Sequence, residues 1–317
     1  MPRLSLGAHI GQQNMTMDAL RQLWRRLEDA GLDWISIWDH FYEAPPQGGT
    51  VPHYEALTTL GALAAETERV QVGCLVFYVG YRNPGLLAKA ATTLDHLSGG
   101  RFVLGLGAGW HESEARAYGY DFPDIGTRLD MLEEAVQIIR GLLTQERTTF
   151  SGRHFRVENA SNLPAPVQER LPIWIGGLGE KRTLRLVARY ADGWNAAYVS
   201  AEKFAHLGSV LDRWCEVEDR DPTEIERTVN LSFSLRTDAA GMAEEDKAIE
   251  AQWGPSAERI RSGSLLGRPD QAFNQVSAYV EAGAQAVNVA LRAPWDDEAL
   301  DFYLQETVPA LRQRFRE

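Results

Sequence analysis

Cysteine and long hydrophobic runs are both scarce in this sequence. Its 317 residues include two cysteines, Cys74 and Cys215, which lie far apart and form no Cys-x-x-Cys pair. Such usage is typical of proteins kept in a reducing compartment, and a chain of this length buries enough surface to fold without cross-links. No apolar run approaches the ~18 residues of a membrane helix, and no charged-then-apolar leader opens the chain. We therefore expect a cytoplasmic protein that makes no use of a membrane.

Positively charged residues are also fewer than negatively charged ones. Lys and Arg number 32 against 44 Asp and Glu, which gives a formal net charge of −12. The basic residues are scattered along the chain and form no stripe. Because polyanions are bound through dense positive charge, this balance argues against nucleic acid or an anionic membrane as a partner. A small-molecule substrate is the expected partner.

The sequence does contain a regular alternation of short apolar runs and longer helical patterns. Most runs are too apolar for a strict two-residue alternation, as expected of parallel strands buried on both faces. Eight such units favour a closed (β/α)8 TIM barrel of the α/β class, with a doubly wound open sheet as the competing topology. The expected strands are Leu4–His9, Trp34–Trp38, Val70–Phe77, Phe102–Leu106, Pro172–Ile175, Gly193–Ala196, Val229–Leu235 and Ala286–Leu291.

The segments between the runs are expected to be helices. Apolar residues in Thr16–Ala30 recur at three- and four-residue steps, and Gly31 is a natural stop. Asn83 and Pro84 supply an N-cap followed by the preferred first-turn proline. The other expected helices are Leu86–Leu97, the Leu129–Leu143 stripe, Thr183–Ala191, Ala201–Asp219, Asp270–Ala282 and Asp296–Phe315.

Two segments interrupt the alternation within what we expect to be a single domain, residues 1–317. The first, about residues 146–171, follows the fourth helix and contains an expected hairpin about Ser151-Gly152. The second, about residues 237–266, follows the seventh strand; it is polar and weakly periodic, with Trp253 as its only aromatic residue. A long excursion at this end of a barrel is commonly a substrate lid. A surface insertion without a role is the alternative.

Candidate catalytic residues lie where strands end, since barrel enzymes place their chemistry there. The second strand runs into Asp39-His40, and an acid beside an imidazole can serve in proton transfer. Asp39 could instead only cap the following turn. His9 ends the first strand, where a packed, hydrogen-bonded histidine is an equal alternative.

Glycines cluster after the fourth and fifth strands. Gly105, Gly107 and Gly109 alternate along one strand end, but Trp110 occupies the place of the third glycine of a dinucleotide fingerprint. After the fifth strand, residues 176–182 form a glycine-rich turn that opens a helix, with Lys181 and Arg182 as cationic donors. Free N–H groups at a helix start form an anion site. We expect a phosphate to bind there, and an ordinary tight turn is the alternative.

Metal and glycosidase chemistry are less well supported. A metal-dependent hydrolase would need converging histidines and carboxylates, yet His9 has no His-x-His partner and we expect no metal. A glycosidase would need a second carboxylate beside Asp39. Glu112 or Glu180 could supply it, although both are better placed to start helices.

At these strand ends the sequence resembles the bacterial luciferase-like superfamily of flavin- and deazaflavin-dependent oxidoreductases. Each motif is weak alone, but their order and spacing over nearly the whole chain are specific. The combination is most similar to the branch that uses coenzyme F420, an 8-hydroxy-5-deazaflavin. The motifs are Trp38-Asp39-His40, Tyr81-Arg82-Asn83-Pro84, the Leu-Asp-His-Leu-Ser-Gly-Gly-Arg run at 94–101, Gly107-Ala108-Gly109-Trp110, and Ile175-Gly176-Gly177 through Ala191-Asp192-Gly193-Trp194-Asn195.

The resemblance implies a TIM barrel that holds the ring system in its mouth, and a possible homodimer. Cys74-Leu75 would form a non-prolyl cis peptide behind the ring, and His40 matches the general base of alcohol- and sugar-oxidising relatives. Gly176, Gly177 and Gly179, together with the backbone amides of Glu180 and Lys181, would hold the phosphate end. The matched cofactor-binding residues are Asp39, Cys74, Leu75, Gly107, Ala108, Gly109, Gly176, Gly177, Gly179, Glu180 and Lys181.

One departure from the family pattern concerns the substrate. Sugar-phosphate dehydrogenase relatives carry a glutamate where this chain has Trp110, which argues against sugar-phosphate oxidation and for a more apolar pocket. The reaction implied is hydride transfer at C5 of F420, with His40 moving the proton. An FMN-dependent monooxygenase and a non-catalytic cofactor-binding barrel are the alternatives. The expected pocket residues are His9, Trp38, Phe77 and Trp110, together with Phe41 and Tyr42.

Overall fold

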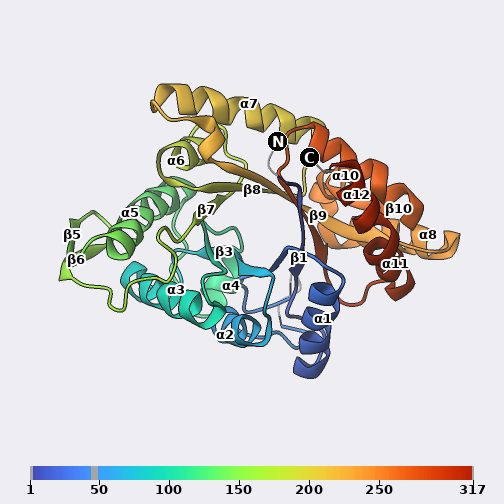
Figure 1. The fold of residues 1–317 in the computed structure, drawn as a ribbon, viewed down its shortest axis with the longest axis horizontal. Helices are drawn as coiled ribbons and strands as arrows, with labels where there is room; N and C mark the ends of the chain where they lie inside the picture. The colour runs from blue at the N-terminus through green and yellow to red at the C-terminus, as the bar shows by residue number, and fades with distance from the viewer. Residues whose placement is uncertain (1–2, 44–48, 316–317) are drawn as a thin grey trace.

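The structure is a computed structural model that describes residues 3–43 and 49–315. Eight parallel strands of this part close into a barrel, in the order β1-β2-β3-β4-β7-β8-β9-β11 (Figure 1). Pairing of β8 with β9 and of β11 with β1 closes the ring, so the barrel prediction is confirmed and the open sheet is wrong. The strands are β1 (Ser5–Ile10), β2 (Trp34–Ile37), β3 (Gln71–Tyr78), β4 (Phe102–Gly107), β7 (Ile173–Gly176), β8 (Gly193–Ala197), β9 (Glu226–Leu235) and β11 (Ala286–Leu291).

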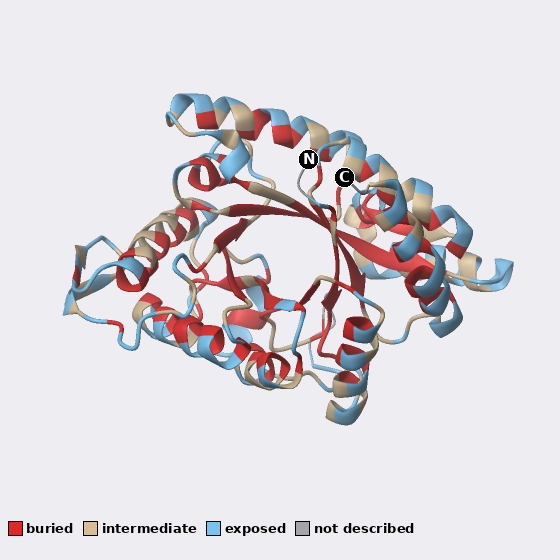
Figure 2. Cartoon of the chain, in the orientation of Figure 1, coloured by how far each residue is buried: buried red, intermediate tan, exposed pale blue. Residues whose placement is uncertain are grey.

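Helices surround the barrel and bury one side each, while their outer sides face solvent (Figure 2). Asn83 caps α3 as expected, accepting a hydrogen bond from the Gly85 amide at 2.8 Å, and Pro84 opens that helix. No helix of the described segments has the length and apolar character that a membrane crossing requires. The helices are α1 (Met17–Asp29), α2 (Ala56–Glu66), α3 (Pro84–Ser98), α4 (Glu112–Ala117), α5 (Ile125–Thr144), α6 (Thr183–Tyr190), α7 (Ala201–Val217), α8 (Ala239–Trp253), α9 (Ala257–Ser262), α10 (Ala272–Glu281), α11 (Asp297–Phe302) and α12 (Val308–Arg314).

Two stacked indoles fill the lower barrel. Trp34 and Trp174 lie face to face with ring centroids 5.0 Å apart, and Leu75 and Val103 complete the cluster. Glycine makes room for them, because a Cβ on Gly73 would lie 2.7 Å from the Trp34 ring. These described side chains therefore close the barrel below, and a cavity opens at the carboxyl ends of the strands.

Strand β3 contains a bulge that changes which side chains face inward. The register of β3 against β4 shifts between Cys74 and Phe77, and the cis peptide lies at Leu75-Val76. The prediction of a cis bond at Cys74-Leu75 is therefore wrong by one residue. Leu75 and Val76 both contact the interior cluster, whereas Cys74 and Phe77 are fully buried among the residues packed between barrel and helices.

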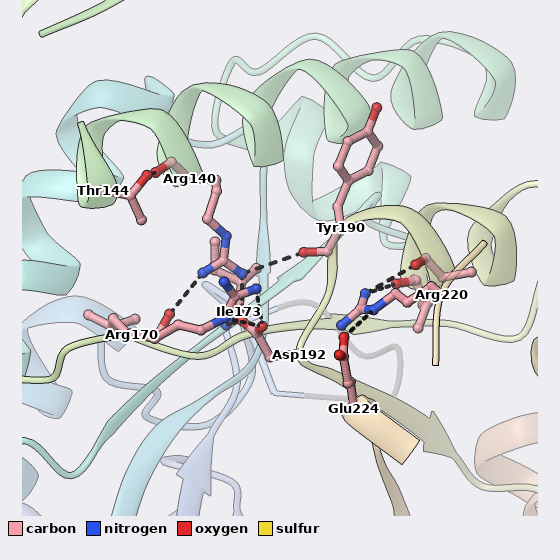
Figure 3. A network of polar contacts seen from close by, with 11 residues as sticks. Arg140, Thr144, Arg170, Ile173, Tyr190, Asp192, Arg220 and Glu224 are labelled. Carbon is pink, nitrogen blue, oxygen red and sulfur yellow. Dashed lines mark hydrogen bonds and ion pairs between the residues drawn. The ribbon is translucent and has the colours of Figure 1, made fainter. Parts of the chain in front are cut away.

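A charged network joins the elements at the amino ends of β7 and β8 (Figure 3). Asp192 accepts hydrogen bonds from Arg140 at 2.5 Å, from Arg170 at 2.8 Å and from the Ile173 amide at 2.8 Å. Arg140 comes from α5, so this one carboxylate ties a helix to the starts of two strands. The network lies at the end of the barrel opposite the ligand entrance.

Both predicted insertions have regular structure. Residues 146–171 hold the antiparallel hairpin β5 (Thr148–Ser151) and β6 (Arg156–Ala160), which confirms the expected hairpin and projects at the side of the barrel opposite α8 (Figure 1). Residues 237–266 form α8, α9 and most of β10 (Ser264–Gly267), which pairs in parallel with the end of β9.

Candidate active site

A cavity of about 570 Å³ opens at the carboxyl ends of the barrel strands. Most of the residues singled out by the sequence line it. These are His9, Trp38, Asp39, His40, Leu75, Gly107, Ala108, Gly109, Trp110, Gly176, Gly177 and Gly179. The cavity is formed by side chains from every barrel strand end, as in other enzymes of this architecture.

His40 is held by a buried carboxylate that the sequence did not single out. Its Nδ1 lies 2.7 Å from Oε2 of Glu114, and the Glu114 side chain is fully buried. The other Glu114 oxygen accepts hydrogen bonds from the amides of Phe41 and Tyr42. With Nδ1 donating to Glu114, Nε2 is the nitrogen of His40 that can exchange a proton in the cavity.

The charge of Glu114 is set by competing effects. Burial acts to raise its pKa, but the hydrogen bond and charge of His40, together with the Phe41 amide, outweigh burial and hold the pKa below its usual range. Glu114 is in the first turn of α4, which is capped by His111 through a 3.3 Å hydrogen bond to the Glu114 amide. Helix α4 therefore positions an ionised acceptor beneath His40.

Asp39 faces away from His40 and pairs elsewhere. Its Oδ2 accepts hydrogen bonds from Arg82 at 2.7 Å and from the Tyr78 amide at 3.1 Å. Burial raises the pKa of Asp39, and the Arg82 guanidinium opposes that rise. Arg82 also bonds Glu55, the cap of α2, at 2.8 Å. Asp39 thus fixes the start of the loop after β3, and it does not act with His40 as a hydrogen-bonded pair.

His9 is buried and neutral. Its Nδ1 lies 2.9 Å from Ser36 Oγ, and its ring meets Trp38 edge-on at 5.2 Å. Burial lowers the pKa of His9 to about 3, with the charges of Arg292 and His40 contributing. His9 is thus a packed, hydrogen-bonded histidine whose ring also forms part of the cavity wall, and its contact with a substrate stays a prediction.

The glycines of β4 and β7 lie against the side chain of Val76. A Cβ on Gly107 would approach Val76 Cγ2 to 2.4 Å, and a Cβ on Gly176 would approach Cγ1 to 2.8 Å. Gly109 has φ +72° and lies against the Tyr78 ring. The cavity floor is therefore a flat ledge made of the β3 bulge and glycine backbone, with Leu75 beside it. Such a ledge can accept a planar ring system.

The turn after β7 leads directly into α6. Gly177 has φ +141°, and Thr183, the first residue of α6, lies beside both Gly177 and Gly179. None of the described residues accepts a hydrogen bond from the amides of residues 179–181. The turn thus presents unpaired N–H groups at the edge of the cavity.

The side chains of Glu180 and Arg182, at this turn, pair with residues of neighbouring helices. The Glu180 carboxylate bonds Lys203 at 2.7 Å and His206 at 3.1 Å on α7, and neither Glu180 nor Lys181 lines the cavity. Arg182 pairs with Asp130 of α5. The prediction for Glu180 and Lys181 concerns their backbone amides, which these side-chain pairings leave available.

Four further predicted residues, besides Glu180 and Lys181, lie outside the cavity. Cys74 is buried behind the barrel wall because it alternates with the inward-facing Leu75. Phe77 is buried there because the β3 bulge reverses the alternation after Leu75 and turns Val76 and Tyr78 toward the cavity. Phe41 packs between Tyr81 at 4.7 Å and Tyr118 at 4.4 Å. Tyr42 contacts Tyr118 edge-on at 5.4 Å. Phe41 and Tyr42 thus support the loop that carries His40.

Trp110 forms one wall of the entrance. It is 54% exposed, meets the His40 ring edge-on at 5.3 Å, and lies 4.8 Å from the His111 ring. This wall is apolar and aromatic, as expected from the sequence.

The opposite wall differs from the expectation of an apolar pocket. Arg292, Arg259, Tyr198 and Trp253 line it, and the sequence analysis singled out none of them as site residues. Arg292 follows the last residue of β11, so the rule that strand ends carry chemistry could have found it. Arg259 and Trp253 come from the 237–266 insertion, for which a substrate lid was one of the two interpretations, but no local pattern indicated which of its residues would reach the cavity.

No group of three His, Cys, Asp or Glu side chains in the described segments is placed to hold a metal ion. The cavity instead combines a flat glycine ledge, an anion-binding turn and one histidine oriented by a carboxylate. A closed (β/α)8 barrel with this arrangement belongs to the class of barrel enzymes that hold a planar, phosphate-bearing cofactor in their mouth.

Comparison with known proteins places the chain in a family. Residues 4–254 match the model of the luciferase-like monooxygenase family, and the chain belongs to it. It is 29% identical to an F420-dependent glucose-6-phosphate dehydrogenase of Microbacterium testaceum (strain StLB037), with 91% of each chain covered.

Solved structures share the fold. An F420-dependent secondary alcohol dehydrogenase in complex with an F420-acetone adduct superimposes with a TM-score of 0.86 at 19% identity, covering 98% of this chain and 99% of that one. The long-chain alkane monooxygenase LadA gives a TM-score of 0.79 at 15% identity, covering 99% and 92%.

Proposed function

We propose that this protein is an F420-dependent oxidoreductase that moves a hydride between the cofactor and a small alcohol or carbonyl substrate. The observation that carries the proposal is the His40–Glu114 pair, with Nδ1 and Oε2 2.7 Å apart, beside the glycine ledge of one cavity. The relatives at 27–29% identity are F420-dependent glucose-6-phosphate dehydrogenases. Their cofactor fits the residues present here.

The residues that would hold the cofactor form two groups. Leu75, Val76, Gly107 and Gly176 provide the flat surface for the ring, because any Cβ at either glycine would meet Val76. The turn from Gly177 to Thr183 provides amides and the start of α6 for the phosphate. When bound, F420 accepts or gives a hydride at C5 of its deazaflavin ring.

His40 moves the proton that accompanies the hydride. In the oxidative direction the substrate C–H bond loses a hydride while the hydroxyl proton passes to Nε2 of His40, and a carbonyl product forms. Glu114 accepts a hydrogen bond from Nδ1–H of His40 and stabilises the imidazolium that results, as a buried carboxylate does beside other catalytic histidines. Trp110 and His111 restrict water on one side of the histidine.

We propose that the substrate differs from glucose 6-phosphate, the compound for which the relatives are named. By the family resemblance, Trp110 stands where the sugar-phosphate dehydrogenases carry a glutamate, and it presents an indole to His40. We propose a substrate whose reacting carbon lies against this aromatic wall.

The proposed location, oligomeric state and partners of the protein rest on the sequence and on the family resemblance. We propose that the protein acts in the cytoplasm as a single-domain homodimer without nucleic-acid partners. Light scattering of the purified protein tests the dimer.

Comparative titration with F420 and FMN tests the cofactor. We expect the fluorescence of F420 to change saturably on binding, with FMN binding at least about tenfold more weakly, a difference of about 1.4 kcal/mol. Tight FMN binding without any change in F420 fluorescence would instead indicate the monooxygenase chemistry of other family members. Binding of neither would indicate a barrel that no longer uses this cofactor class.

A further inference from the structure

His111 carries a buried hydrogen-bond donor at the edge of the cavity. Its Nδ1 accepts a hydrogen bond from the Glu114 amide at 3.3 Å and lies 3.2 Å from Ser113 Oγ. Because a nitrogen that accepts an amide proton carries none itself, the proton of the neutral ring is on Nε2. This Nε2 is buried without a partner among the described residues, and His111 lines the cavity. The other described imidazole nitrogens that are buried and unpartnered, on His53 and His154, belong to residues that do not line it.

The environment of His111 keeps its ring neutral. Burial lowers the pKa of His111, while the charge of Glu114 opposes this effect and the charge of His40 adds to it. His111 is 6% exposed, and the Trp110 ring lies 4.8 Å from its ring. An N–H group shielded from water in this way costs free energy as long as it stays unpaired. The Nε2–H group of His111 therefore favours a ligand atom that accepts a hydrogen bond.

Glu114 fixes the rings of His40 and His111 in opposite roles. Its backbone N–H occupies Nδ1 of His111, which leaves a donor at Nε2 of that ring. Its carboxylate, whose lowered pKa keeps it ionised, can only accept from Nδ1 of His40 at 2.7 Å. His40 therefore presents the lone pair of Nε2 as an acceptor. One residue thus produces a donor on one imidazole and an acceptor on its neighbour.

The spacing of the two rings suits a single oxygen atom between them. The ring centroids of His40 and His111 lie 5.7 Å apart, with the planes inclined by 61°. One oxygen at hydrogen-bond length from two nitrogens needs those nitrogens no more than about 5.8 Å apart. A hydroxyl group matches the pair, because its O–H donates to the acceptor while its lone pair accepts from the donor. A carbonyl oxygen matches once His40 is protonated, because it then accepts from both rings.

We propose that His111 is a second catalytic residue, whose Nε2–H binds the oxygen of the hydroxyl group that His40 deprotonates and keeps this hydrogen bond as the oxygen becomes a carbonyl. This inference rests on the proposed function. In the oxidative direction the O–H bond breaks and its proton goes to Nε2 of His40. The C–H bond breaks, the hydride leaves with its electron pair, and the C=O bond forms. The donor on His111 stabilises the negative charge that develops on the oxygen during these steps.

Two reciprocal variants separate this donor from the capping of α4 by His111. Asn is a favoured N-cap and places an oxygen near the position of Nδ1, so His111→Asn keeps the cap and lacks the Nε2 donor. Gln reaches the position of Nε2 with an amide N–H but loses the cap. We expect Tm to stay near that of wild type in His111→Asn and to fall by about 2–4 °C in His111→Gln. Thr16→Ala is the matched control, because it removes a 3.2 Å cap bond to the Ala19 amide of α1 at a residue outside the cavity lining.

Trifluoroethanol is the probe, titrated into the protein loaded with F420 and followed by fluorine NMR. Its electron-poor carbon resists loss of hydride, so it acts as an alcohol that binds without reacting. We expect saturable binding in wild type and in Thr16→Ala, binding about fivefold weaker in His111→Asn, the effect of losing one hydrogen bond, and partial recovery in His111→Gln. Trifluoroethyl methyl ether, which lacks the O–H group, should bind wild type more weakly than the alcohol does. NMR of the ring nitrogens, without any ligand, should show the proton of His111 on Nε2.

The outcomes separate this inference from the proposed function. Equal affinity of wild type and His111→Asn for trifluoroethanol, no binding of it to wild type, or a proton on Nδ1 of His111 would each overturn the inference and leave the proposed function intact. The affinity for F420, measured by its own fluorescence, should change less than twofold in His111→Asn. A large loss would assign the donor to the cofactor and also overturn the inference. Failure of wild-type protein to bind F420 would instead remove the proposed function, a result on which the position of the His111 proton does not depend.

Discussion

At the scale of single residues, the site depends on the orientation of one imidazole. Glu114 binds Nδ1 of His40 from below and is itself fixed by two backbone amides and the start of α4. The ring therefore has a defined tautomer before any ligand enters. This pre-orientation is what general base catalysis requires.

Replacing His40 by Ala should lower kcat by about 10²–10⁴-fold, the usual contribution of a general acid or base. Affinity for F420 should change little, because the glycine ledge and the turn after β7 remain intact. Stopped-flow measurement of hydride transfer and fluorescence titration of F420 provide the two readouts. Equal loss of rate and affinity would identify His40 as a cofactor contact.

The Glu114→Gln variant should have an effect on kcat between those of wild type and His40→Ala. The amide retains the shape of the carboxylate but can present either an acceptor or a donor to Nδ1, so the tautomer of His40 is no longer fixed. We expect kcat to fall by about 10–100-fold with KM nearly unchanged. A change in KM alone would mean that Glu114 supports only the fold of the Phe41 loop.

Some residues of the site could be predicted from the sequence, and others could not. His40 and the glycines of β4 and β7 could be predicted because strand ends and glycine turns leave local patterns. Glu114 could not, because it is separated from His40 by 74 positions and only the packing of α4 brings them together. Arg292 was accessible to the same strand-end argument that found His9.

At the scale of elements, β3 determines the shape of the cavity floor. A regular strand would have placed Phe77 inward with Leu75, and the bulge instead presents Val76 and Tyr78. The apolar run at 70–77 predicted the strand but carries no sign of the bulge. The resemblance located the cis bond one residue too early for the same reason.

Gly107→Ala should disturb this floor. The added Cβ would lie 2.4 Å from Val76 Cγ2, so Val76 must move into the space expected to hold the cofactor ring. We expect at least a tenfold increase in the Kd for F420, and partial recovery in the double variant with Val76→Ala, since contacting residues are not additive. Gly61→Ala in α2 is the control, because nothing lies within 4 Å of its Cβ and helix propensity favours the change.

The α8–α9 insertion should be the least stable element of the mouth. Ile249 is the one buried residue of α8, and it packs with Ala257 and Ile260 in a cluster separate from the main core. We expect amide hydrogens of residues 239–253 to exchange faster than those of α3, and to slow when F420 occupies the cavity that Trp253 lines. Uniform exchange across both helices would show that the insertion is a rigid part of the barrel.

At the scale of the whole molecule, stability and chemistry occupy opposite ends of the barrel. The stacked Trp34 and Trp174 fill the lower interior, and the Asp192 network joins α5 to the starts of β7 and β8. Burial acts to raise the pKa of Asp192, but Arg140 and the Ile173 amide outweigh it and hold the pKa below its usual range.

Asp192→Asn should therefore destabilise the protein, by about 2–4 kcal/mol at neutral pH, because Arg140 loses its buried partner. The lowered pKa means that this contribution is complete above the ordinary carboxylate range and is lost as pH falls through the folded-state value. Chemical denaturation at pH 7 and at pH 4 measures it, and the gap between wild type and variant should narrow at the lower pH. Glu158→Gln, on an exposed ion pair, should change stability by less than about 0.5 kcal/mol.

The plugged floor beneath the cavity has a consequence for how such a protein can diverge. Because Trp34, Trp174 and the Asp192 network secure the barrel without any atom of the mouth, residues such as Trp110, Trp253 and Arg292 can be exchanged with little effect on folding. New specificities can then arise through replacements at the rim alone. We expect a library confined to these rim positions to remain mostly folded while its members differ in the charge of the substrates they accept.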